Sequence, residues 1–330
     1  MHNKQLIMLG DVNVDNIWPV PAIPKPGRDG LVDTVKMECG GAILNSTILL
    51  DRLGVPTVLL ACLGEDLWAS YIWDALSSTG IDMSAVQTTG EKNTGLDFIL
   101  VTPDGERTMV GYRGANVLLH PDKIPASIFE NVGIVHISGY ALLEPPQSDG
   151  VMRAVEFAIV NQIPISIDTG LEPVMRNVDA FSKILPALEI CIIGIEEVDY
   201  LLGAVSAEEA GEKLIETGVN MAAIKMGEAG SLLKTKDKAI HCPCFDVEVI
   251  DTTGAGDAYT AGILYGYYTG LSMDAIGMLA SALGALATTV NGAGLSLPRQ
   301  EELNTLLREK NRLALHENEH ITTELLSHFN

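Results

Sequence analysis

The run Asp251-Thr-Thr-Gly-Ala-Gly-Asp257 places two carboxylates around two threonines and two glycines. Residues 248–250 before it resemble the end of an extended segment, and a helical pattern follows over 258–269. Glycines before a helix let consecutive amides face one hollow, where the positive end of the helix dipole also favours an anion. A helix cap needs one acidic residue but no glycines. The run therefore predicts an anion hole formed by Gly254, Ala255 and Gly256.

Phosphoryl transfer is the chemistry that suits such a turn. The amides would bind a phosphate and stabilise its charge, while Asp257 takes the proton of an attacking hydroxyl. The sequence contains no GxxxxGK[ST] motif, and no G-x-G-x-x-G follows its first strand-like run. A P-loop protein and a dehydrogenase are both disfavoured, and the phosphate donor is expected to lie across open strand ends.

A regular framework must position this turn, and the chain alternates strand-like runs with helical patterns. The strand-like runs cover residues 57–62, 133–137, 163–167, 189–193 and 221–225. The helical patterns cover residues 42–53, 66–79, 152–161 and 207–216. This alternation predicts βαβ units. We expect an α/β fold with a Rossmann-like, doubly wound, mostly parallel sheet and helices on both of its faces.

Two segments depart from this alternation. Residues 14–39 are rich in proline and glycine, and residues 94–113 predict a hairpin around Pro103-Asp104-Gly105. We predict that they pair into a small β-sheet, which would form a lid over the strand ends where doubly wound folds bind ligands. An edge hairpin without function is the alternative. No repeat or linker is evident, so residues 1–330 are expected to form one domain with the lid inserted.

Composition limits the classes of partner and the compartment. Hydrophobic residues make up 47% and charged residues 19%, as in a folded protein with a sizeable core. The net charge of -22 repels phosphate backbones and anionic lipids, so neither a nucleic acid nor a membrane is an expected partner. Five cysteines without paired spacing predict free thiols and a cytoplasmic location. The uncharged stretch 275–298 is interrupted by polar residues, glycines and a proline, and predicts a buried helix.

Three motifs resemble those of the ribokinase-like (PfkB) carbohydrate kinases. Residues 251–262 resemble the second signature of that family. Residues 40–45, followed by 53–54 and 64–66, resemble the first signature, and residues 10–15 resemble the N-terminal motif. The motifs occur in the family's order and span most of the chain. The resemblance implies a Rossmann-like domain with a β lid, which transfers the γ-phosphate of ATP to a hydroxyl of a small carbohydrate.

The resemblance also implies roles for individual residues. Asp257 would be the catalytic base, and Asp15 would accept hydrogen bonds from a pair of substrate hydroxyls. The residues implied on the sugar side are Asp15, Asn13, Gly40, Gly41, Asn45 and Glu144. Those implied on the nucleotide side are Lys225, Gly227, Gly230 and Asn291.

The resemblance implies two metal ions as well. Asp251 and Thr253, together with backbone carbonyls, resemble a monovalent-cation site, so K+ is expected. Mg2+ is expected with ATP, and the family's Asn-x-x-Glu motif for it matches Gly194-Ile-Glu-Glu197. Glu197 is therefore present, whereas glycine replaces the asparagine. Magnesium retains several waters and needs few protein ligands, so this replacement does not exclude it.

The acceptor is left open by the sequence. Arg113 in the lid hairpin could pair with an acidic group, which adds keto-deoxy sugar acids to pentoses and hexoses, although a surface ion pair explains it equally well. Ala42 replaces a lysine that is frequent in ribokinases, so ribose is not specifically indicated. A nucleoside kinase is the nearest alternative, with Trp18 and Phe98 as residues for a base. Gly194 alone favours a sugar-binding regulator without catalysis.

The assembly is predicted from the lid. Exposed edges of a small sheet can pair with a second copy, so a homodimer through the lid sheets is expected.

Overall fold

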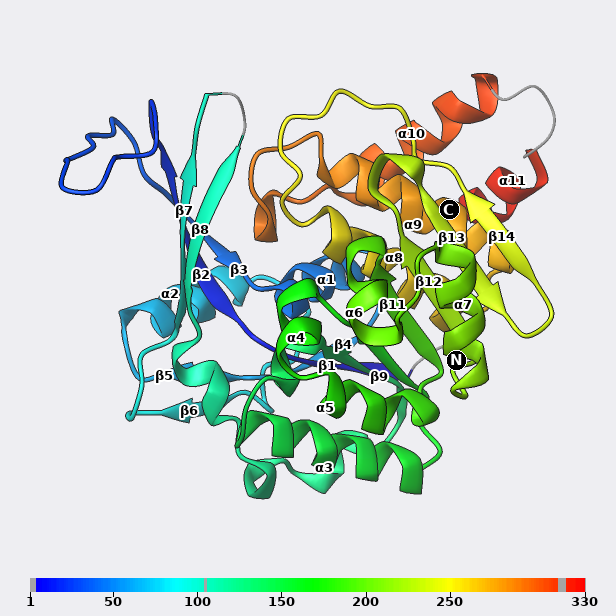
Figure 1. Cartoon of the computed structure of the whole chain (residues 1–330), viewed down its shortest axis with the longest axis horizontal. Coiled ribbons are helices and arrows are strands. Elements are labelled where there is room, and N and C mark those ends of the chain that lie inside the picture. The colour runs from blue at the N-terminus through cyan, green and yellow to red at the C-terminus, as the bar shows by residue number, and fades with distance from the viewer. Residues whose placement is uncertain (1–3, 104–105, 314–318, 330) are drawn as a thin grey trace.

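The computed structural model describes residues 4–103, 106–313 and 319–329. Within these ranges, eight strands form the central sheet (Figure 1). Their order is β14-β13-β12-β11-β10-β9-β1-β4; all neighbours from β12 to β4 are parallel, and β13 and β14 are antiparallel. The strands are β1 (Gln5–Leu9), β4 (Thr57–Leu60), β9 (Val132–Ser138), β10 (Ile165–Asp168), β11 (Ile190–Gly194), β12 (Met221–Lys225), β13 (Ser231–Thr235) and β14 (Ala239–Cys242). The predicted mostly parallel sheet is confirmed.

Helices cover both faces of this sheet because its side chains alternate between two apolar cores. Leu6 and Met8 of β1 belong to one core, and Ile7 and Leu9 belong to the other. The first core is covered by α1 (Ala42–Arg52), α2 (Leu67–Leu76), α8 (Ala255–Thr269), α9 (Met273–Ala287), α10 (Gln300–Leu313) and α11 (Glu319–His328). The second is covered by α3 (Gln147–Val160), α4 (Leu171–Arg176), α5 (Val178–Ile184), α6 (Val198–Leu202) and α7 (Ala207–Glu216).

A second sheet of four strands, which we call the lid sheet, stands beside the central sheet at the left of Figure 1. Its strands are β3 (Lys36–Gly40), β2 (Asn13–Pro19), β7 (Gly95–Val101) and β8 (Arg107–Tyr112), in that order. The two predicted segments do pair as expected, with β2 parallel to β7. Residues 104 and 105 of the predicted hairpin turn lie outside the described residues.

Strand register divides the lid sheet into two faces. Asp15 lies opposite Glu38 and Asp97, and Arg107 lies opposite Val101. Side chains at paired positions point the same way and alternate along each strand, so all of these residues share one face, which we call the inner face. The outer face carries the alternate positions, which include Trp18, Met37, Phe98, Val110 and Tyr112.

Several boundaries differ from those predicted. The predicted strand 57–62 is divided into β4 and β5 (Cys62–Gly64), and β5 pairs instead with β6 (Gln87–Thr89). Residues 248–250 form no strand. Helix α8 begins three residues earlier than expected because Gly254, with φ 76°, adopts the left-handed conformation just before it. Within the described residues, no helix is both long and apolar enough to cross a membrane.

Candidate active site

The anion-hole turn is held in shape by Asp251. Its Oδ1 accepts hydrogen bonds from the Thr253 amide (2.9 Å) and hydroxyl (2.6 Å), and its Oδ2 accepts one from the Gly292 amide (2.8 Å). The turn leads directly into α8, whose first amides have no acceptor within the helix. Gly254 has φ 76°, which favours glycine, and a Cβ there would also lie close to the Cβ of Ala293, at 3.1 Å. The arrangement can bind an anion at the start of α8.

Asp257 lies in the first turn of α8 and is fixed by helix α1. Asn45 Nδ2 donates to Asp257 Oδ2 (2.7 Å), and Ser46 Oγ donates to the Asp257 carbonyl (2.9 Å). Burial raises the pKa of Asp257 to about 6, while the bond from Asn45 acts in the opposite direction. The carboxylate is therefore ionised at neutral pH and can accept a proton. Asn45, predicted to line the sugar site, contacts Asp257 itself.

Asp15 marks a polar site under the inner face of the lid sheet. Its Oδ1 is buried and, among the described residues, has no hydrogen-bond partner. Burial, assisted by Asp97 and Glu38, raises the pKa of Asp15 to about 8. A Cβ on Gly40 would lie 2.2 Å from Asp15 Oδ1, so the glycine makes room for this carboxyl group. A substrate hydroxyl is a suitable donor to the unsatisfied oxygen.

Asn13 and Gly41, also predicted on the sugar side, lie next to this carboxyl group in the fold. Asn13 Nδ2 donates to Asp97 Oδ2 (2.8 Å), and its Oδ1 accepts from Asn116 Nδ2 (2.7 Å). Gly41 has φ 98°, and a Cβ there would lie 2.3 Å from the Asp11 carbonyl oxygen. Asn13 therefore links β2 to Asp97 and Asn116 through hydrogen bonds, and Gly41 allows the backbone to pass close to Asp11.

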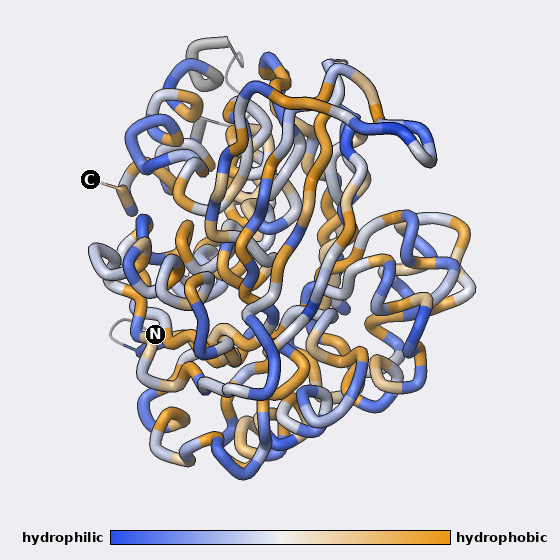
Figure 2. The backbone as a smooth tube through the Cα atoms, turned by 90° about the vertical axis from the view of Figure 1, so that its left-hand side faces the viewer, coloured by the Kyte–Doolittle hydropathy of each residue, from blue (hydrophilic) through white to orange (hydrophobic). Residues whose placement is uncertain are grey.

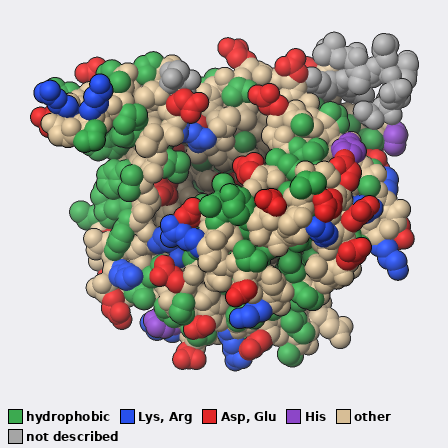
Figure 3. Space-filling model, viewed as in Figure 1, with side chains coloured by type: hydrophobic (Ala, Val, Ile, Leu, Met, Phe, Trp, Pro, Cys, Tyr) green, Lys and Arg blue, Asp and Glu red, His purple; other side chains and the backbone are tan. Residues whose placement is uncertain are grey.

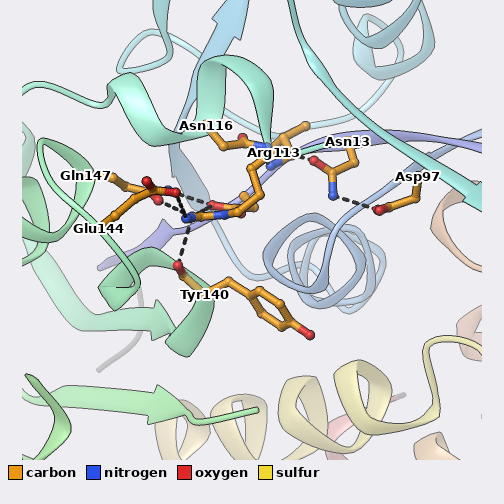
Figure 4. A network of polar contacts seen from close by, with 9 residues as sticks. Asn13, Asp97, Arg113, Asn116, Tyr140, Glu144 and Gln147 are labelled. Carbon is orange, nitrogen blue, oxygen red and sulfur yellow. Dashed lines mark hydrogen bonds and ion pairs between the residues drawn. The ribbon is translucent and has the colours of Figure 1, made fainter. Parts of the chain in front are cut away.

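Arg113 is occupied by neighbouring groups of the protein. Its guanidinium donates twice to Asp11 (2.9 and 3.1 Å), once to Glu144 Oε1 (3.1 Å), once to the Tyr140 carbonyl (2.8 Å) and also to Gln147. Figure 4 shows it pointing toward Glu144 and Gln147, with the ring of Tyr140 turned away. Arg113 and Glu144 thus bind each other, and Arg113 is not presented as a free cation for a substrate.

Lys225, from the end of β12, lies beside the anion hole. Its Nζ donates to both carboxylate oxygens of Asp168 (2.7 and 2.9 Å), and a Cβ on Gly256 would lie 3.5 Å from it. Although burial acts to lower it, the carboxylates of Asp168 and Glu197 raise the pKa of Lys225. The lysine is therefore a fixed cation where a phosphate would bind. Asp168 was not predicted, although it ends β10, at the edge where such sheets bind ligands.

Glu197 lies beside the glycine at position 194. A Cβ at Gly194 would lie 2.7 Å from Glu197 Oε1, the end of a flexible side chain that would have to shift to make room. Glu197 is buried, accepts a hydrogen bond from Thr169, and has its pKa raised by burial to about 7. Mg2+ prefers one or two carboxylates together with waters and phosphates. Glu197 and Asp168 fit that donor set, although no group of three metal-binding side chains occurs among the described residues.

Two cavities meet at these groups. A cavity of about 640 Å³ is lined by residues that include Lys225, Gly227, Gly230, Thr252 and Gly256. A smaller cavity of about 110 Å³ is lined by residues that include Ser138, Tyr140, Asp168, Lys225 and Asp257. Figure 3 shows the surface hollowed between the lid and the body of the molecule. Asn291 does not line either cavity; its carbonyl accepts from Lys36 (3.3 Å). Lys225 borders both cavities, as a group that contacts a transferred phosphate would.

Comparisons with known proteins agree with this geometry. The family model described as pfkB family carbohydrate kinase matches residues 3–300. The ribokinase of Haemophilus influenzae is 27% identical over 310 residues, which cover 92% of this chain and 98% of that protein. The aminoimidazole riboside kinase of Salmonella typhimurium is 28% identical, over 82% of this chain and 88% of that protein.

A solved structure shows the same fold. The ribokinase of Arabidopsis thaliana, complexed with ribose and ATP, superposes with a TM-score of 0.79 at 24% identity, covering 92% of this chain and 98% of that one. The family match extends over nine tenths of the sequence and includes the anion-hole turn, Asp257 and the lid strands. The chain therefore belongs to the pfkB family of carbohydrate kinases, which makes it a phosphotransferase.

Proposed function

We propose that this protein transfers the γ-phosphate of ATP to a hydroxyl of a small uncharged sugar. The observation that carries the proposal is the position of Asp257, which lines the smaller cavity at the first turn of α8, beside the larger one. The larger cavity has a volume suited to a nucleotide, with the anion hole and Lys225 at its border.

Each group has one part in the proposed reaction. Asp257 takes the proton from the acceptor hydroxyl as its oxygen forms a bond to the γ-phosphorus, and the bond from phosphorus to the ADP oxygen breaks. The amides of 254–256 and the Lys225 ammonium stabilise negative charge on the phosphoryl oxygens. Mg2+ held near Glu197 and Asp168 would neutralise part of the charge of ATP.

The electrostatics of the acceptor site favour an uncharged sugar over a keto-deoxy sugar acid. Asp15 and Asp97 lie on the inner lid face, and Asp257 faces the same region from α8. Arg113, the cation predicted to pair with an acid, is bound by Asp11 and Glu144. An acidic substrate near Asp15, Asp97 and Asp257 would therefore meet acidic groups, and Arg113 is not free to pair with it, whereas hydroxyl groups can donate to these residues.

A nucleoside is the second candidate acceptor. Trp18 and Phe98, suggested for a base by the sequence, lie on the outer lid face and do not serve this purpose. The inner face instead carries Ile17, Ile99 and Met109 in one row above Asp15 and Asp97. This apolar row could contact a base whose sugar hydroxyls bind Asp15.

The predicted monovalent cation would share Asp251 with several donors of the protein. Asp251 Oδ1 and Oδ2 accept hydrogen bonds from Thr253 and Gly292, and Arg107 Nη1 lies 3.5 Å from Asp251 Oδ1. A potassium ion bound to Asp251 would therefore lie near the Arg107 guanidinium, and no step of the proposed reaction is assigned to K+.

A screen of acceptors tests the proposed function. ADP release from Mg·ATP is followed with pentoses, hexoses, keto-deoxy sugar acids and nucleosides, in KCl and in NaCl of equal ionic strength. We expect turnover with an uncharged sugar or a nucleoside, the slowest rates with sugar acids, and little difference between the salts. Binding of a sugar without ADP release for any acceptor would instead support the regulator alternative.

We propose a homodimer through the lid, and the outer face of the lid sheet supports this predicted assembly. Met37, Phe98, Val110 and Tyr112 are all exposed there, and Figure 3 shows hydrophobic side chains gathered over the lid. Figure 2, which faces the lid, also shows hydrophobic residues along its strands. An apolar patch of this kind is typical of a protein interface.

Val110→Asp is expected to convert a dimer into a monomer, because it would bury an unpaired charge at the interface. Light scattering at several concentrations measures the mass. Val160→Asp is the matched control, since Val160 is 80% exposed on α3, away from the lid. A wild-type protein that is monomeric at all concentrations would contradict the dimer.

The predicted cytoplasmic location is supported by the cysteines. Among the described residues all five are free thiols, and Cys39, Cys62, Cys191 and Cys242 are buried. Such thiols are typical of reducing compartments.

A further inference from the structure

Arg107, a residue that the sequence analysis did not assign, connects the lid sheet to the anion-hole turn. Its Nη2 donates to Thr252 Oγ1 (2.7 Å), and its Nη1 donates to Thr253 Oγ1 and lies 3.5 Å from Asp251 Oδ1. These partners are about 145 positions away in the sequence. The contact therefore depends on the lid lying over the turn.

The register of the lid directs this side chain inward. Arg107 is the first residue of β8 and lies opposite Val101 on the inner face, whereas the next residue, Thr108, points outward. Arg107 is 25% exposed, so its guanidinium is partly removed from water. Thr252, which it contacts, lines the 640 Å³ cavity. The cation is thus held at the edge of the proposed nucleotide site.

The Arg107 guanidinium is a positive charge near this cavity in a strongly acidic protein. The protein has a net charge of -22, and Lys225, the cation among the described residues that line this cavity, is paired with Asp168. Arg107 uses one N–H of each terminal nitrogen on the threonines, and a guanidinium has five donors. The remaining donors can bind an oxyanion without release of the turn.

We propose that Arg107 is a catalytic residue that binds the terminal phosphate of the nucleotide from the lid side, opposite Lys225. This inference deepens the proposed function and rests on it. When the acceptor oxygen bonds to phosphorus and the bond to ADP breaks, Arg107 donates to the phosphoryl oxygens, while the proton goes to Asp257. Because Arg107 belongs to the lid, the cation reaches the phosphate only when the lid covers the site, which limits transfer of the phosphate to water.

The alternative is a purely structural latch, in which Arg107 only balances Asp251 and holds the lid closed. A latch would affect the binding of the acceptor under the lid. It would not distinguish nucleotides that differ by one phosphate, and an added guanidinium compound would not restore the rate. The two roles can therefore be separated by measurement.

The test compares wild type, Arg107→Ala, Arg107→Lys and the neighbouring control Thr108→Ala. In Arg107→Ala we expect kcat to fall by about 10²- to 10³-fold, since arginines that stabilise phosphoryl transfer contribute at least this much. Lysine should restore only part of the rate, because it lacks the planar fork. Guanidinium chloride at low millimolar concentration should raise kcat of the alanine variant alone, and Thr108→Ala should match wild type.

Binding gives a readout that does not need turnover. Calorimetry with Mg·ATP and Mg·ADP should show at least a tenfold loss of ATP affinity in Arg107→Ala and little loss for ADP. Equal losses for both nucleotides, or an unchanged kcat with a raised KM for the acceptor, would overturn the proposal in favour of the latch. If wild type phosphorylates no acceptor, the proposed function fails, and the two nucleotide affinities still decide whether Arg107 contacts the terminal phosphate.

Discussion

Asp257→Asn is expected to reduce kcat by about 10³-fold or more, since general-base catalysis contributes about 10²- to 10⁴-fold. The amide has nearly the shape of the carboxylate and can still accept the hydrogen bond from Asn45, so the fold and both cavities should persist. It cannot take the proton of the acceptor hydroxyl. Steady-state ADP release measures the effect, and equilibrium binding should give dissociation constants for sugar and nucleotide within about threefold of wild type.

Ser46→Ala is the matched control for Asp257→Asn. Ser46 donates only to the backbone carbonyl of Asp257, so its loss leaves the reacting carboxylate in place. We expect its kcat to stay within about tenfold of wild type, because one neutral hydrogen bond contributes only about 1 kcal/mol. If the kcat of Asp257→Asn is also within about tenfold of wild type, the Asp257 carboxylate is excluded as the base.

The same carboxylate sets the expected pH dependence. The base must be ionised, and burial places the pKa of Asp257 at about 6, so kcat/KM should fall as the pH drops below about 6. The hydrogen bond from Asn45 lowers this pKa. Asn45→Ala should therefore move the acid limb of the profile to higher pH. If the acid limb stays at the same pH in Asn45→Ala, the limb reports the ionisation of a group other than Asp257.

The parts of the site that are local in sequence could be predicted from it. The anion-hole turn, Asp257 and its helix occupy one short segment, where glycines and a helix start have a direct conformational meaning. The strand β12 was predicted with its observed bounds because its first four residues, which are buried, form a continuous apolar run. The end of α8 at Thr269 was predicted, whereas its start was missed because it depends on the backbone conformation of Gly254.

Contacts between distant segments could not be predicted in this way. Arg107 and Thr253 are 146 positions apart, and only the placement of the lid sheet over the turn brings them together. Arg113 could equally have been a substrate ligand or an ion-pair partner until Asp11 and Glu144 were located beside it. The glycine at 194 was interpreted as the loss of a ligand position. In the structure Glu197 Oε1 lies beside this glycine, at the end of a side chain that can shift, so packing alone does not require the glycine.

Asp15→Asn is expected to impair the acceptor site and to stabilise the protein at alkaline pH. Asp15 Oδ1 is buried without a partner, and above about pH 8, where Asp15 ionises, a charge-assisted hydrogen bond to a substrate hydroxyl contributes about 1.5–3 kcal/mol. Its loss should raise the KM for the sugar roughly 10- to 100-fold while the KM for ATP changes little. Initial rates at varied sugar and fixed Mg·ATP measure this effect, and an unchanged KM for the sugar would remove Asp15 from the acceptor site.

The expected gain in stability follows from the sign of the pKa change. Burial and the nearby carboxylates raise the pKa of Asp15 to about 8, above its value of about 3.9 in an unfolded chain. The unfolded chain therefore ionises first, and the stability that wild type has below pH 4 is lost progressively as the pH rises to about 8. An asparagine cannot ionise, so the melting temperature of Asp15→Asn should exceed that of wild type by several degrees at pH 8–9. The two should converge toward pH 4, whereas Asp74→Asn, at an exposed site on α2, should follow wild type throughout. A stability gain together with a weaker sugar site would identify Asp15 as a carboxylate that is unfavourable in the fold and needed for binding.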